Sequence, residues 1–127
     1  MSVKTRGETE NEISQAIITF EREYMGRGPE ETKTYIFDDI VLVRLRGVLT
    51  PAEKQLANTS DNKGRGLIKQ VRQELIEKAR PLLESIITDI LHCGIRSLHT
   101  DISTTIGERV IIFTLAKSPV FAGESVK

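Results

Sequence analysis

Two histidines, one cysteine and an aspartate that lie close together in the sequence could ligate a transition metal. His92 and Cys93 come just before a segment in which His99 and Asp101 lie two residues apart, on one face if that segment is a strand. Imidazole, thiolate and carboxylate groups are the usual zinc ligands. The spacing matches no zinc template, and a histidine and a cysteine at a helix end are commonly a base facing the helix dipole and a small buried side chain. We therefore expect no metal and no cofactor.

Arginines flanked by glycines suggest a second kind of chemistry, the binding of an anion. Arg27 and Arg65 each lie between two glycines, and the second segment directly precedes a long helical pattern. Exposed N–H groups at the start of a helix attract anions. Neither segment has the spacing of a Walker or dinucleotide loop, so a flexible loop is the plain alternative. With Arg44, His99 and Asp101, these arginines would form a small-anion or nucleotide site, or an enzyme site, beside the sheet.

The sequence identifies no catalytic residue. The adjacent carboxylates Asp38 and Asp39 could bind a metal or work as an acid–base pair, but aspartates are also what a tight turn prefers. No nucleophile elbow and no nucleophile–base pair is recognisable. Whether the chain is an enzyme stays open, and the weight of these observations lies against it.

Seven segments have the periodicity or composition of regular structure. Apolar residues recur every three or four positions in residues 8–25 and 67–91, which predicts two amphipathic helices, the second continuing through Pro81 with a kink. Thr50, Pro51 and Glu53 form a capping box that starts a short helix. Alternating β-branched and aromatic residues predict four strands, at residues 34–37, 40–46, 95–103 and 108–116.

The order of these segments predicts an α+β fold of two layers. Two hairpins would form a four-stranded, mainly antiparallel sheet with helices on one face, in the order α-β-β-α-β-β. The 127 residues make one domain, with a core at about residues 7–116 and a flexible tail at residues 117–127.

The face of the sheet turned away from the helices is the informative surface. Alternation places Leu42, Val110 and Ile112 there, and large apolar faces are uncommon on monomers. We therefore expect a homodimer, against the alternative that the tail or the first helix covers this face. Arg44, Arg46 and Arg109 would either form a basic strip on the same face or pair at its edge with Glu108 or Asp101.

Composition narrows the function class. Lysine and arginine total 18, aspartate and glutamate total 18, and the net charge is zero, which argues against nucleic-acid binding. The single cysteine cannot form an internal disulfide and fits a reducing compartment. The sequence contains neither the apolar core of a signal peptide nor an apolar run of about 20 residues. We expect a soluble, cytoplasmic protein that does not insert into a membrane.

Four short motifs, taken together, resemble a known family. They are YMGRGP at residues 24–29, VRLRGVLTPAE at 43–53, HTDIS at 99–103 and GERV at 107–110. In combination, over about residues 7–115, the chain resembles the MpsC-like family of small bacterial proteins, a domain of unknown function. The family label refers to a Na+-translocating, membrane-potential-generating system, so the resemblance implies an association with membrane transport or inorganic-carbon physiology. It brings no catalytic residue. Because nothing in this sequence can cross a bilayer, the resemblance implies an accessory or regulatory role.

These observations lead to one principal hypothesis and one rival. The principal hypothesis is a soluble, non-catalytic accessory module that acts by homodimerisation and by binding a protein partner, through Leu42, Arg44, Val110 and Ile112. The loop at residues 26–29 would add to that surface. The rival is the small-anion or nucleotide site described above, possible with or without catalysis. The identity of the partner or ligand lies beyond the sequence.

Overall fold

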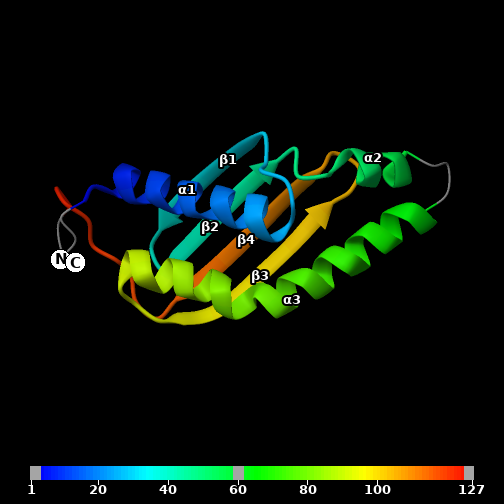
Figure 1. Ribbon diagram of the computed structural model, residues 1–127. Coiled ribbons are helices and arrows are strands. Elements are labelled where there is room, and N and C mark those ends of the chain that lie inside the picture. Colours follow the sequence, from blue (N-terminus) through cyan, green and yellow to red (C-terminus); the bar gives the residue numbers. More distant parts are fainter. Residues whose placement is uncertain (1–3, 59–61, 125–127) are drawn as a thin grey trace.

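The computed structural model describes residues 4–58 and 62–124 and has the α+β architecture that the sequence predicts (Figure 1). Three helices and four strands follow one another as α1 (Arg6–Tyr24), β1 (Glu31–Phe37), β2 (Ile40–Arg46), α2 (Pro51–Ala57), α3 (Lys63–Leu91), β3 (Ile95–Ser103) and β4 (Glu108–Leu115).

The first helix starts at a capping box and buries one stripe. The Thr5 hydroxyl accepts a hydrogen bond from the Glu8 N–H, and the Glu8 carboxylate accepts one from the Thr5 N–H. These two bonds satisfy backbone donors that an α-helix leaves free at its start. From there, Ile13, Ile17 and Phe20 face the sheet and are buried. The helix therefore lies across the sheet by its apolar stripe, as the periodicity predicts.

The second and third helices meet at a glycine. The predicted capping box of α2 is present, since Thr50 and Glu53 exchange hydrogen bonds. The long helix begins at Lys63 rather than at the predicted residue 67, and the flexible-loop reading of residues 64–66 is wrong. A Cβ atom on Gly64 would lie 2.3 Å from the Leu56 carbonyl oxygen, so the two helices can pack this closely only at a glycine. The helix continues unbroken through Pro81.

All four strands pair antiparallel in the order β1-β2-β4-β3, so the two hairpins lie side by side with β2 and β4 in the centre. Asp38 and Asp39 form the turn of the first hairpin, and Asp38 adopts a positive φ of 52°, which an aspartate tolerates. The turn interpretation of this carboxylate pair is thus confirmed.

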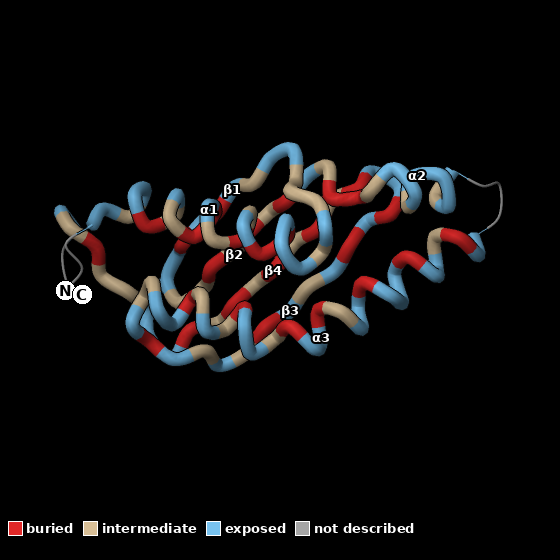
Figure 2. The backbone as a smooth tube through the Cα atoms, viewed as in Figure 1, coloured by how far each residue is buried: buried red, intermediate tan, exposed pale blue. Residues whose placement is uncertain are grey.

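Both long helices lie on the same face of the sheet, and the core fills the space between the layers (Figures 1 and 2). The strands contribute alternate residues to it, as a half-buried sheet requires. The fully buried members from the helices and central strands include Ile13, Ile17, Leu83, Ile87, Val41, Val43, Leu45, Ile111, Phe113 and Leu115.

The segment after the last strand is packed rather than free over its described part. Phe121 is 1% exposed, and the Arg6 guanidinium lies 4.8 Å from its ring centroid. The Ala122 N–H donates to the Lys4 carbonyl, which ties this segment to the start of α1. The expectation of a flexible tail therefore fails for residues 117–124, because a buried aromatic ring fixes them. Residues 125–127 of the predicted tail lie outside the described residues.

Candidate functional site

The face of the sheet opposite the helices carries an apolar patch. Register places Tyr35 opposite Leu42 and Leu42 opposite Ile112, so these three side chains form one row across three strands. Phe37 and Ile40 form the row beside it, and Tyr35 and Phe37 are 43% and 48% exposed. We call the six residues Tyr35, Phe37, Ile40, Leu42, Val110 and Ile112 the outer patch. No helix or strand in the described ranges covers it (Figure 1).

The other half of this face is ionic. The Arg44 Nε donates to Glu108 at 2.8 Å, and Arg46 lies 3.7 Å from the same carboxylate and 3.5 Å from Glu31. The pairing reading of Arg44 and Arg46 is thereby confirmed. Glu108 is the shared acceptor, and the ion pairs lie at the surface, where each contributes little to folding. The outer face therefore passes from apolar to charged along the strands.

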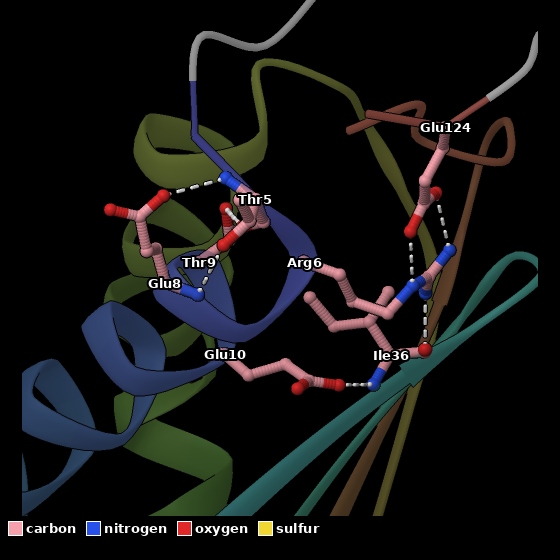
Figure 3. A network of polar contacts seen from close by, with 7 residues as sticks. All are labelled: Thr5, Arg6, Glu8, Thr9, Glu10, Ile36 and Glu124. Atoms are coloured by element: carbon pink, nitrogen blue, oxygen red, sulfur yellow. Dashed lines mark hydrogen bonds and ion pairs between the residues drawn. The ribbon is translucent and has the colours of Figure 1, made fainter. Parts of the chain in front are cut away.

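Helix side chains bind the backbone of one residue at each edge of the sheet. At the β1 edge, the Ile36 N–H donates to Glu10 at 2.8 Å and the Ile36 carbonyl accepts from Arg6, which also binds Glu124 (Figure 3). At the β3 edge, Arg80 donates to the Leu98 carbonyl at 3.2 Å. Unpaired edge groups are a common site of strand addition, and charged side chains are a known defence. Helix side chains thus occupy part of each edge at Ile36 and Leu98.

The structure brings together the four residues predicted to bind a partner. Leu42 pairs in register with Ile112, and Arg44 pairs with Val110, all four on the outer face. His99 lies opposite Ile112 on the neighbouring strand, so it borders the same patch.

Asp101 extends the outer face at the β3 edge. It lies opposite Val110, and its carboxylate lies 3.3 Å from the Lys69 ammonium. The Ile102 N–H donates to it, which lowers the pKa of the Asp101 carboxyl. Although His99 and Asp101 share the face as predicted, the partners of the Asp101 carboxylate are Lys69 and the Ile102 N–H.

The two glycine-flanked arginines lie apart from these residues. Arg27 donates to the Gly47 carbonyl at 3.3 Å and lies 3.4 Å from Glu30. Arg65, in the first turn of α3, donates to the Ala57 carbonyl at the end of α2 at 3.0 Å. Each arginine fastens a different segment of backbone. A cleft of about 530 Å³ at the ionic end of the face includes Arg44 and Arg46 in its lining but neither of these two.

Arg109 is the main correction to the sequence-based site. It does not join a basic strip on the outer face, because alternation along β4 turns it inward with Ile111 and Phe113, and it is 2% exposed. Two further charged residues are buried near it, Glu21 at 0% and Arg72 at 2% exposed. With Glu53 they form what we call the inner charge cluster, between the helices and the sheet.

The two arginines of the inner charge cluster have unequal partners. Arg72 donates to both carboxylate oxygens of Glu53, at 2.9 and 2.6 Å, and to the Val48 carbonyl at 2.9 Å. Arg109 donates through Nη1 to the Thr100 hydroxyl at 2.9 Å. Within the described chain, Arg109 Nε and Nη2, Arg72 Nη1 and both Glu21 oxygens have no hydrogen-bond partner.

Burial shapes the electrostatics of the inner charge cluster. It raises the pKa of Glu21 despite the attraction of Arg109 and Arg72, and it lowers the pKa of Arg109. The pKa of Glu53 is lowered instead. Burial acts to raise it, but the hydrogen bonds from Arg72 and Thr50 outweigh that effect.

The histidine and cysteine residues form no evident metal centre. His92 ends α3 in the left-handed conformation and is exposed, whereas Cys93 is buried and its burial raises the pKa of the thiol. Over residues 4–58 and 62–124, no three His, Cys, Asp or Glu side chains gather closely enough to hold a metal ion. Nor does any helix in these ranges have the length and apolar character needed to span a membrane.

Comparison with known proteins places the chain in a family. Its residues 5–117 match the family model described as "Na+-translocating membrane potential-generating system (MpsC)". It is also 42% identical over 112 residues to the "Uncharacterized protein YbcI" of Bacillus subtilis (strain 168), covering 88% of this chain and 89% of that protein. No solved structure matches it. With a family model spanning nearly the whole chain and a relative of this similarity, the protein belongs to the MpsC family.

Proposed function

We propose that this protein is an accessory or regulatory module of a membrane transport system, that it acts in the cytoplasm, and that it works as a homodimer joined through the outer face of its sheet. The observation that carries the proposal is the outer patch, six apolar side chains on an open face. The link to transport rests on the family description. Burying an apolar face of this kind is the usual driving force for association.

The occupant that fits this face best is a second copy of the same chain. A two-fold interface brings one surface against itself, so its charges must be mixed in sign. The outer face meets this condition, since its ionic half carries three cations and three anions: Lys33, Arg44, Arg46, Glu31, Glu108 and Asp101. The apolar half can pack against its own copy without leaving a charge unpaired.

The size of the face also suits a dimer. Four strands of about seven residues cover an area of about 19 by 24 Å at the usual strand spacing and rise. A standard interface buries about 800 Å² on each partner, including the relief of its side chains. The sheet face alone would supply a little more than half of that area.

The proposal is tested by the mass of the protein in solution and by one pair of variants. Light scattering coupled to size exclusion should give twice the 14.2 kDa chain mass for the wild type. Ile112→Glu should return it to one chain mass and raise the dimer dissociation constant by about 100-fold or more, because an unpaired carboxylate would be buried. Val71→Glu is the matched control, since Val71 is an exposed apolar residue of α3.

Three results would overturn the homodimer. The first is a wild-type monomer at about 100 μM, well above the dissociation constants of standard interfaces. The second is a dimer that Ile112→Glu leaves intact, which would place the interface elsewhere. The third is a wild-type monomer that forms a 1:1 complex with a different protein through Ile112, which would keep the surface but change its occupant. Circular dichroism checks that each variant is folded.

A further inference from the structure

The cleft of about 530 Å³ at the ionic end of the outer face lies where three segments of the chain meet. They are the end of β2, the helix α2 and the turn between β3 and β4, and α2 lies at the end of the sheet where β2 and β3 finish (Figure 1). The Val48 N–H donates to the Gly107 carbonyl at 3.1 Å, which ties the connection from β2 to α2 to this turn. The volume of the cleft lies within the range of small-molecule sites.

The charged side chains of the cleft leave a surplus of positive charge. Its lining contains three cations and two anions, which are Arg44, Arg46, Lys54, Glu30 and Glu108. Glu108 accepts a hydrogen bond from the Arg44 Nε at 2.8 Å. Glu30 lies 3.4 Å from Arg27, which is outside the lining. Each carboxylate of the cleft therefore has an arginine of its own, and two cations remain.

Those two cations, Arg46 and Lys54, have donors to offer. Arg46 lies 3.7 Å from Glu108 and 3.5 Å from Glu31, and both distances exceed those of a good hydrogen bond. Within the described ranges, Lys54 makes no ion pair and no side-chain hydrogen bond. Both residues are exposed and line the cleft. An anion that enters the cleft can therefore accept charge-assisted hydrogen bonds from them without breaking an existing one.

The rest of the lining is largely apolar or carries hydroxyl groups. Leu49 and Ala57 contribute apolar surface, and Thr104 and Thr105 contribute hydroxyls. Ile106, in the turn between β3 and β4, is 67% exposed, more than any other large apolar side chain in the described part of the chain. Covering such a side chain with apolar atoms of a ligand removes it from water. The lining thus suits a molecule that has both an apolar part and a negative charge.

We propose that this cleft binds a small organic anion, whose carboxylate or phosphate group contacts Arg46 and Lys54 and whose apolar part packs against Ile106. The cleft has room for a molecule much larger than an inorganic anion. Arg46 belongs both to the cleft and to the ionic half of the outer face, so the cleft borders the proposed dimer interface. The site itself lies within one chain and does not depend on the dimer.

The test is an amide NMR titration of the full chain with two probes, benzoate and phenyl phosphate, at constant ionic strength. Benzyl alcohol, which keeps the ring and lacks the anion, is the uncharged control. We expect at least one of the two anions to shift the amide signals of Lys54 and Ile106 with a millimolar dissociation constant, as is usual for molecules of about ten heavy atoms. Binding of one anion alone supports the proposal and assigns the charged group.

Three results of this titration would overturn the site. The first is no response to either anion up to about 50 mM, well above the dissociation constants of such molecules. The second is equal affinity for benzyl alcohol, which would mean that the cations contribute nothing. The third is a response confined to residues outside the cleft.

Variants locate the anionic group. Lys54→Ala should weaken binding severalfold, and Arg46→Ala should weaken it about tenfold, because each removes a charged donor at an exposed position. Lys78→Ala and Arg96→Ala are the matched controls, since both residues are exposed and lie outside the lining. The amide spectra show whether each variant is folded. Equal affinities in the Lys54 and Lys78 variants, and in the two arginine variants, would overturn the site.

The Ile112→Glu variant separates this site from the homodimer. Ile112 lies outside the lining of the cleft, so this variant should bind the anion like the wild type, whether or not the wild type is a dimer. A wild-type monomer that binds the anion would support the site and overturn only the dimer. Loss of binding in a folded Ile112→Glu variant would overturn a site contained in one chain.

Discussion

Each half of the inner charge cluster is an arginine and a glutamate, Arg72 with Glu53 and Arg109 with Glu21. The halves differ in how many hydrogen bonds their charged groups make. In the half between α2 and α3, Arg72 makes three hydrogen bonds to Glu53 and Val48. In the half between α1 and β4, Arg109 makes one, and both oxygens of Glu21 lack a partner in the described chain. The first half joins two helices; the second half borders a cavity between α3 and β3.

This difference teaches which buried charges serve the fold and which are available for another use. A buried charge that makes several hydrogen bonds to its neighbours holds its elements in place, and its removal leaves those neighbours without a partner. A buried charge with unpartnered donors is a cost to the fold, and such residues tend to lie at functional sites. The Arg72 half should therefore contribute more to stability than the Arg109 half.

The largest expected effect comes from breaking the Arg72 half. Arg72→Met should destabilise the protein by about 3 kcal/mol, because Glu53 and the Val48 carbonyl lose their shared donor in a buried site. Urea denaturation measures the loss. Arg96→Ala, an exposed arginine at the start of β3, should change the stability by less than about 0.5 kcal/mol. A loss below about 1 kcal/mol for Arg72→Met would mean that this half does not support the fold.

A smaller effect follows from separating the helices that carry this pair. Gly64→Ala should cost about 2 kcal/mol, since its Cβ would lie 2.3 Å from the Leu56 carbonyl oxygen and would push α2 from α3. Gly66→Ala, two residues along the same helix, meets nothing within 4 Å and should stabilise the protein by about 0.5–1 kcal/mol. Thermal denaturation of both variants gives the comparison, and equal melting temperatures would show that the close helix contact carries no weight.

The smallest effect is a difference in pH dependence between the two glutamates. The pKa of Glu21 is raised above its usual 4.5, so the stability linked to its protonation is present below that pH and is lost as the pH rises through the folded pKa. Glu21→Gln should remove this loss, so the variant should gain stability relative to the wild type as the pH rises from 4 to 8.

Glu53 should respond in the opposite direction. Its pKa is lowered, so its contribution is present above pH 4.5 and is lost as the pH falls through the folded pKa. The stability advantage of the wild type over Glu53→Gln should therefore shrink under acid conditions. Denaturation curves of the wild type and both variants between pH 3.5 and 8 check this pair. Parallel pH profiles for the two variants would contradict the contrast between the halves.

The fold could be predicted from local signals because each element is consistent with its own sequence. The capping box at Thr50 and the alternation along residues 40–46 and 108–115 were sufficient to place α2, β2 and β4. The start of α3 was missed because glycines disfavour helices locally, and only the contact of Gly64 with α2 makes a glycine necessary there. The packing of Phe121 was missed because it depends on a long-range contact with α1.

The outer face was predictable, and the inner charge cluster was not recognised. Strand alternation alone places Leu42 and Ile112 together once the central strands pair. The same alternation puts Arg109 with Ile111 and Phe113, and helical spacing puts Arg72 between Ile68 and Ile76. Both patterns are visible in the sequence. Because arginine is so rarely buried, however, the sequence analysis assigned Arg109 to the surface in spite of its position in the strand. Which charges pair across three elements depends on tertiary structure.

The contacts of Phe121 and Glu124 with Arg6 have a practical consequence for the design of truncated versions of this protein. The family match ends at residue 117, so a fragment cut to that boundary would lack a ring that is 1% exposed and the carboxylate that grips Arg6. Such a fragment would expose apolar surface beside α1, and it should aggregate for that reason alone. A truncation or a fusion tag should therefore be placed after Glu124, so that the contacts of Phe121 and Glu124 are kept.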